Sequence, residues 1–227
     1  MLPGESNLVK VYAFSIGDDS DIRLGDALPC LNQEENDRAQ SFRFDVHRER
    51  YVRSRGKLRT VLGECLGCSP NEVPLLIDEM GKPYLPDGEV HFNLSHSEDL
   101  AVVAVSRVPS IGVDVELFSR EVDIDGLGNR CFRESEIKRM QSLGGDDKVR
   151  AFFWTWTAKE ARMKATGEGF RLEPKRIEIL FAGEYPRECV APVEPSAHIQ
   201  AVDLSHKNAA CTVAALSPFT TELVTRS

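Results

Sequence analysis

Two carboxylates stand two residues apart in the middle of the chain, in the run Gly112-Val113-Asp114-Val115-Glu116. On a strand, residues at this spacing face the same side, so Asp114 and Glu116 would point together while the valines enter a core. Convergent carboxylates suit Mg²⁺, which takes a few carboxylates together with substrate phosphates and waters. An exposed strand with alternating acidic residues and no metal would have the same sequence pattern, so the motif alone leaves both interpretations open.

A second candidate pair lies on a predicted helix further along the chain. Glu160 and Lys164 are four residues apart and therefore share one helical face. Such a pair is most often a solvated salt bridge. Trp154, Trp156 and Met163 nevertheless indicate a partly buried helix. A carboxylate and an ammonium on such a helix are expected to have a functional role.

Polar side chains also gather in Phe92-Asn93-Leu94-Ser95-His96-Ser97, at the end of a predicted strand. Such clusters are typical of binding loops, although His96 taken alone is more often a structural histidine. Before them, Gly81-Lys82-Pro83 predicts a rigid turn that presents one ammonium outward.

The charge of the chain is unevenly spread. The net charge is −8, yet residues 43–59 hold seven Arg or Lys against two acids. This contrast indicates an anionic partner at that segment. The acidic total argues against general nucleic-acid binding.

Length and composition predict a soluble, cytoplasmic protein. The 227 residues are 41% hydrophobic and 28% charged, and no apolar run approaches the roughly 18 residues of a membrane span. The first ten residues lack the pattern of a secretory signal.

Apolar periodicity predicts helices and strands in both parts of the chain. One buried helical face is expected to hold Tyr51, Leu58, Leu62 and Cys65. The predicted helices cover 33–66, 134–143 and 148–166, the last one ending at Gly167 and Gly169, and the predicted strands cover 8–16, 75–78, 90–95, 101–107, 111–116, 177–181, 197–204 and 210–216. The apolar pattern restarts near residue 110, which divides the chain into halves 1–110 and 111–227. Each half combines helices with a small sheet, so the fold class is α+β.

Four motifs occur in the order of one family: G-K-P, then F-N-L-S-H-S, then G-V-D-V-E, then W-T-A-K-E-A-R-M-K followed by G-E-G. In this the chain resembles the Sfp-type 4′-phosphopantetheinyl transferases, over about half its length. The resemblance implies two similar halves related by pseudo-twofold symmetry, with coenzyme A bound between them. It also implies a site completed within one chain, so a monomer is expected.

The resemblance implies a role for each matching residue. Asp114, Glu116 and Glu160 would bind Mg²⁺, with Mn²⁺ as the other candidate. Glu160 would also take the proton of the incoming serine, directly or through water, and Lys164 would hold a phosphate oxygen. The reaction would move phosphopantetheine from coenzyme A to a serine of an apo acyl, peptidyl or polyketide carrier protein and release 3′,5′-ADP.

Coenzyme contacts follow from the same resemblance. The 3′-phosphate would be held by Lys82, Ser95 and His96, with help from one or more of the arginines of the basic segment, Arg50, Arg53 and Arg55. Lys159 faces away from Glu160 and would contact either the nucleotide or solvent.

Two other functions fit part of the pattern. A magnesium-dependent phosphatase or pyrophosphatase would use the same carboxylates, but no pattern for water activation or a phosphoenzyme nucleophile stands out. A non-catalytic module that binds coenzyme A or a carrier would not need three carboxylates and a lysine together.

Overall fold

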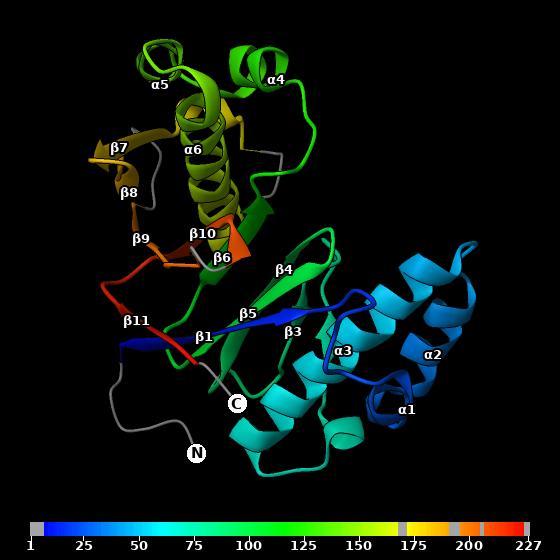
Figure 1. Cartoon of the computed structure of the whole chain (residues 1–227). Helices are drawn as coiled ribbons and strands as arrows, with labels where there is room; N and C mark the ends of the chain where they lie inside the picture. Colours follow the sequence, from blue (N-terminus) through cyan, green and yellow to red (C-terminus); the bar gives the residue numbers. More distant parts are fainter. Residues whose placement is uncertain (1–6, 168–171, 191–195, 205–206, 225–227) are drawn as a thin grey trace.

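The computed structural model describes residues 7–167, 172–190, 196–204 and 207–224. The α+β class expected from the sequence is confirmed. Two β-sheets pack face to face, and the two longest helices cover their outer faces (Figure 1). No helix in the described part of the chain is long and apolar enough to cross a membrane.

The first half supplies three strands of a four-stranded sheet and a group of helices beside it. Its elements are β1 (Leu8–Ser15), α1 (Leu24–Ala27), the 3₁₀ turn η1 (Leu28–Cys30), α2 (Gln33–Gln40), α3 (Asp45–Leu66), the 3₁₀ turn η2 (Pro70–Glu72), the small hairpin of β2 (Leu76–Ile77) and β3 (Pro83–Tyr84), β4 (His91–Ser97) and β5 (Leu100–Ser106).

The second half supplies a five-stranded sheet. Its elements are β6 (Ile111–Leu117), α4 (Ile124–Cys131), α5 (Glu134–Gln141), α6 (Gly145–Thr166), the 3₁₀ turn η4 (Pro174–Arg176), β7 (Glu178–Ala182), β8 (Tyr185–Val190), β9 (Ala197–Ala201), β10 (Ala209–Ala215) and β11 (Thr220–Leu223). The strand β11 leaves this half and pairs in parallel with β1 at the edge of the first sheet.

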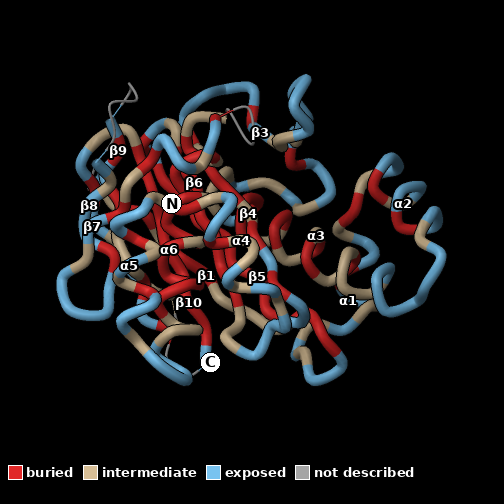
Figure 2. The backbone as a smooth tube through the Cα atoms, turned by 90° about the horizontal axis from the view of Figure 1, so that it is seen from above, coloured by how far each residue is buried: buried red, intermediate tan, exposed pale blue. Residues whose placement is uncertain are grey.

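Alternation along the strands builds the layers. Val113 and Val115 enter the central core between the sheets, as the sequence predicts, while Asp114 between them faces α6. The outer face of the first sheet packs on Leu58 and Leu62 of α3, and the outer face of the second sheet packs on α6. Buried residues accordingly concentrate where the sheets and long helices meet (Figure 2).

The two halves repeat one arrangement, as the resemblance implies. The strand order β1-β5-β4 of the first sheet matches β6-β10-β9 of the second, and every neighbouring pair in both runs is antiparallel. The helices α3 and α6 are each 22 residues long, and each ends at a left-handed glycine, Gly67 or Gly167, with φ of 72°. The division at residue 110 itself stays a prediction.

A buried cation fixes each long helix to its surroundings. In the first half, the Arg59 guanidinium donates to the Glu35 carboxylate at 2.5 Å and to the carbonyls of Pro70 and Val73. Glu35 is the third residue of α2 and closes its capping box. We call this group the Arg59 clamp.

The second half repeats the device with a lysine. The Lys159 ammonium lies 2.8 Å from the Glu136 carboxylate and donates to the carbonyls of Pro174 and Ile177. Glu136 again occupies the capping-box position of the preceding helix, α5. This Lys159 clamp matches the Arg59 clamp group for group, so it confirms the repeat at the level of side chains.

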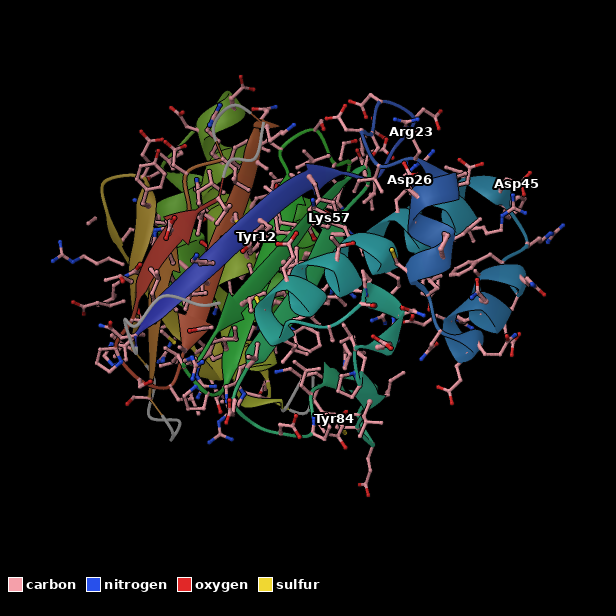
Figure 3. All side chains as sticks on the ribbon, turned by 90° about the horizontal axis from the view of Figure 1, so that it is seen from below. Tyr12, Arg23, Asp26, Asp45, Lys57 and Tyr84 are labelled. Atoms are coloured by element: carbon pink, nitrogen blue, oxygen red, sulfur yellow. The ribbon has the colours of Figure 1, made fainter. Side chains whose placement is uncertain are left out.

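The structure also corrects the predicted elements. The single helix expected over 33–66 breaks after Gln40, and α3 restarts at Asp45 behind Phe44. Tyr51 therefore does not join Leu58 and Leu62; it packs in a small separate core with α1 and α2. In Figure 3, Asp45 lies at the far end of the lobe formed by α1, α2 and the start of α3, whereas Arg23 and Asp26 lie beside α1, nearer to the first sheet.

Candidate active site

The candidate site forms where α6 crosses β6, and Gly112 permits the crossing. A Cβ at Gly112 would lie 2.2 Å from the Ala161 carbonyl oxygen and 2.5 Å from the Ala165 nitrogen, so only glycine allows this contact between helix and strand. The close approach sets Glu160 and Lys164 of α6 over the α6-facing side of β6. There they meet the two carboxylates of the G-V-D-V-E motif.

Lys164 and Asp114 form the centre of the site. The Lys164 ammonium donates to Asp114 Oδ1 at 2.6 Å, to Ser95 Oγ at 3.0 Å and to the Val113 carbonyl at 3.2 Å. An ammonium has three protons, so its donors are all used. Holding a phosphate oxygen would require Lys164 to exchange one of these acceptors.

Glu116 lies beside this centre with its side chain almost wholly buried. Its Oε2 accepts from the Ser97 hydroxyl at 2.5 Å, and its Oε1 pairs with the Arg120 guanidinium. Burial, with the negative charge of Asp114, raises the pKa of the Glu116 carboxyl.

Glu160 is the least compensated carboxylate of the site. Burial, followed by the negative charge of Asp114, raises its pKa to about 7. Within the described residues, neither Glu160 Oε1 nor Asp114 Oδ2 has a hydrogen-bond partner, although both atoms are buried. Two buried carboxylate oxygens without donors fit a divalent cation.

The three carboxylates are not gathered into a finished metal cluster. No three acidic, histidine or cysteine side chains converge closely enough for one in the ranges that the structure describes. Lys164 and Arg120 instead neutralise Asp114 and Glu116. Metal binding by Asp114, Glu116 and Glu160 therefore stays a prediction.

Ser95 and His96 point to opposite faces of β4, as neighbours on a strand do. Ser95 is buried and bonded to Asp114 at 2.8 Å. His96 is exposed, and its pKa is lowered by partial burial and by the nearby charges of Lys164 and Arg50. This geometry therefore does not favour the binding of one phosphate by Ser95 and His96 together. Of the two, the exposed His96 is better placed to contact the 3′-phosphate.

The basic segment is largely used within the protein. Arg50 pairs with Asp99 at 2.7 Å, which places it beside the turn between β4 and β5, close to His96. Arg53 donates to the carbonyls of Ile16 and Ile22, and Arg55 lies over the Tyr51 ring. Of the three predicted arginines, Arg50 is the one that the structure brings to the site.

The two remaining lysines have internal partners. Lys159 is fully buried in its clamp, so the structure contradicts the predicted contact with nucleotide or solvent. The reason is that position 159 lies on the side of α6 that faces α5, where the Lys159 ammonium pairs with the buried carboxylate of Glu136. The Lys82 ammonium donates to the carbonyl of Lys164 at 2.7 Å, near the end of α6, and also to that of Ile111. Gly169, expected after α6, lies outside the described residues.

Two cavities flank this centre, and residues of both halves line each of them. One of about 340 Å³ lies at the His91 end of β4 and is lined by Lys82, Tyr84, His91, Phe92, Ile111 and Ala165 among others. The other, of about 420 Å³, lies at the Asp99 end and includes Val46, Arg50, Asp99, Leu117 and Lys207. The carboxylates thus sit between two spaces that a long ligand could bridge.

Sequence reasoning missed Arg120 and gave no individual role to two other contributors to this site, Ser97 and Gly112. Ser97 carried a usable signal, because it lies two residues after Ser95 and so shares its face. Arg120 follows β6 in a turn whose path no local pattern predicts.

Comparisons with known proteins cover both halves. The 4′-phosphopantetheinyl transferase superfamily matches residues 110–214, and the N-terminal part of 4′-phosphopantetheinyl transferases matches residues 19–108. The 4′-phosphopantetheinyl transferase HetI of Nostoc sp. is 39% identical over 174 residues, which cover 74% of this chain and 73% of that protein.

A second relative and one solved structure were also compared. The 4′-phosphopantetheinyl transferase Sfp of Bacillus subtilis is 30% identical and covers 63% of this chain and 68% of its own length. A holo-(acyl-carrier-protein) synthase structure from Bacillus anthracis is 23% identical, covers 47% of this chain and 94% of its own, and has a TM-score of 0.41. The matches to both halves and to HetI show that this chain belongs to the 4′-phosphopantetheinyl transferase superfamily.

Proposed function

We propose that the protein transfers the 4′-phosphopantetheine arm of coenzyme A to a serine hydroxyl of an apo carrier protein. The observation that carries the proposal is the group of buried carboxylates around Lys164, at the junction of two halves that match this family. Buried acids with unpartnered oxygens beside a lysine suit the handling of a diphosphate and its metal.

Asp114, Glu116 and Glu160 would hold Mg²⁺. When bound, this ion would neutralise the diphosphate oxygens of coenzyme A. The two unpartnered oxygens of Asp114 and Glu160 are the feature of this structure that fits such an ion.

Glu160 is the proposed base. The pKa of about 7 belongs to the metal-free carboxyl, and a bound Mg²⁺ would lower it, so a water between Glu160 and the serine would carry the proton once the ion is in place. The serine oxygen would bond to the β-phosphorus as its proton passes to Glu160 through this water. The bond from that phosphorus to the bridging oxygen would break, and 3′,5′-ADP would leave with the electron pair.

Lys164 would stabilise the leaving group. Its ammonium now bonds Asp114, and charge developing on the bridging oxygen would compete for one of its protons. His96 and Arg50 would meet the 3′-phosphate on the other face of β4.

The test is intact mass spectrometry of apo carrier proteins of the fatty-acid, polyketide and peptide types, each incubated with this protein, coenzyme A and Mg²⁺. A gain of one phosphopantetheine on the carrier serine, lost with EDTA and with Asp114→Ala, is the expected result. Release of 3′,5′-ADP without a carrier would favour a hydrolase instead. Coenzyme binding with no transfer to any carrier would favour a non-catalytic module.

A further inference from the structure

The two sheets are joined at the site by side chains rather than by backbone pairing. β4 is the last strand of the first sheet and β6 is the first strand of the second. Three side chains at alternate positions of β4 accept hydrogen bonds from alternate N–H groups of β6: Asn93 from Val113 at 2.8 Å, Ser95 from Val115 at 3.4 Å and Ser97 from Leu117 at 3.2 Å. We call Asn93, Ser95 and Ser97 the β4–β6 ladder.

Each serine of this ladder makes a second hydrogen bond, in which its hydroxyl is the donor. A hydroxyl accepts and donates at once, so each serine can bind an N–H group and still pass its own proton onward. Ser95 donates to Asp114 and Ser97 donates to Glu116, at 2.8 and 2.5 Å. In each case the acceptor is the carboxylate that precedes the bound N–H group.

The two carboxylates depend on their serines to different degrees. Asp114 Oδ1 is held by Ser95 and also by the Lys164 ammonium, which is anchored on α6. For Glu116, the second partner is Arg120, whose side chain is 44% exposed and therefore weakly constrained. Glutamate also has one more rotatable bond than aspartate, so Glu116 has more orientations to lose.

We infer that Ser97 is a positioning residue of the transfer reaction, holding the Glu116 carboxylate in the orientation that faces Asp114. Ser97 would touch neither substrate nor metal and would act only through Glu116. The inference rests on the proposed function, in which Glu116 is a metal ligand. Groups that orient metal ligands from behind typically change metal affinity or activity about 10-fold to 100-fold when removed.

The chain offers a matched control in Ser106 of β5. Its hydroxyl also accepts from a backbone N–H, that of Val108, and donates to an oxygen, the Leu8 carbonyl, at 2.6 Å. It is as buried as Ser97 but contacts no carboxylate of the site. Ser106→Ala therefore removes a comparable pair of bonds without reaching Glu116.

The experiment titrates Mn²⁺ into wild type, Ser97→Ala, Ser106→Ala and Glu116→Gln, with free Mn²⁺ read by electron paramagnetic resonance. We expect Ser97→Ala to weaken Mn²⁺ binding about 10-fold or more, and Ser106→Ala to stay within about twofold of wild type because its site is intact. Ser97→Thr, which keeps the hydroxyl, should bind more tightly than Ser97→Ala. The Mg²⁺ concentration giving half-maximal transfer should rise for Ser97→Ala alone of the two alanine variants.

The outcomes separate the inference from the function on which it rests. Unchanged Mn²⁺ affinity in Ser97→Ala, with clear weakening in Glu116→Gln, overturns the role of Ser97 and leaves the proposed metal site standing. Full affinity in Glu116→Gln removes Glu116 as a ligand and the inference with it. If Ser97→Ala does not fold, Ser97→Cys keeps the volume with a weaker donor and is expected to bind Mn²⁺ less tightly than wild type.

Discussion

At the scale of the single residue, Glu160 couples the chemistry of the site to the stability of the protein. Its carboxyl has a pKa of about 7 in the folded state and an ordinary value of 4.5 in the unfolded state. Between these values the folded protein keeps a proton that the unfolded chain has lost, so stability falls as pH rises through this window. The charged form is thus the one that the fold disfavours.

Glu160→Gln should therefore stabilise the metal-free protein at pH 8. The gain is expected to be about 3 kcal/mol, because one pKa unit corresponds to 1.36 kcal/mol and the pKa rises from 4.5 to about 7 on folding. The gain should vanish near pH 4. Urea unfolding in EDTA at both pH values measures it, and a gain that is equal at both would mean that titration is not its origin.

His96 gives a prediction about substrate rather than stability. His96→Ala should raise KM for coenzyme A about 10-fold or more, because it removes a contact to a charged group worth roughly 1.5–3 kcal/mol. Dephospho-coenzyme A lacks the 3′-phosphate, so its KM should hardly change. Kinetics with both substrates make the comparison, and equal losses with both would return His96 to a structural role.

Sequence spacing captured the residues that local geometry positions. Period-two alternation placed Asp114 and Glu116 on one side of β6, and period-four spacing placed Glu160 and Lys164 on one side of α6. It could not say which cations are committed elsewhere. Arg53 and Lys159 are used by carbonyls and acids distant in sequence, and such partners are unknown before the chain folds.

At the scale of the element, the Arg59 and Lys159 clamps hold α3 and α6 to their neighbours. Both cations are fully buried, and both face a glutamate at a helix start. Removing one partner of a buried ion pair leaves an uncompensated charge and typically costs about 3–5 kcal/mol.

Arg59→Met and Lys159→Met should each lower the free energy of unfolding by about 3–5 kcal/mol for that reason. Lys138→Met is the control, because the Lys138–Glu134 pair is exposed on α5 and its loss should change stability far less. Chemical denaturation measures all three. A loss at Lys159 no larger than at Lys138 would contradict the clamp.

Element boundaries failed where tertiary contacts decide them. The break between α2 and α3 follows from the packing of Tyr51 and Val52 in a small lobe with α1. Residues 41–44, where the break occurs, contain no glycine or proline that would predict it. β8 and β11 carry too few apolar residues in alternation to predict a strand, and each exists because a neighbouring strand offers an edge.

At the scale of the whole molecule, the central core joins the halves. Val9, Val102 and Ala104 of the first sheet pack with Val113, Cys211 and Val213 of the second, all of them fully buried. The face-to-face packing brings together strands far apart in sequence, which is why the sequence predicts two halves but not their shared interior.

Heating should consequently unfold the protein in one transition. Neither sheet can expose its inner face without also exposing that of the other, so the halves should lose structure together. In differential scanning calorimetry, the calorimetric and van't Hoff enthalpies should agree. Two resolved transitions would show that the halves are independent units.

The internal repeat has a consequence for stoichiometry. When Arg59 is aligned with Lys159, Thr60 stands where the other half has Glu160, and Glu64 stands where it has Lys164. The scaffold is thus doubled, while the acid and the lysine of the site occur in that arrangement on α6 alone. Because only one of the two similar halves carries this acid and lysine, each chain should bind and turn over a single coenzyme. The half that contains α3 would then form one wall of the binding site without supplying these two groups, so its sequence could change more freely.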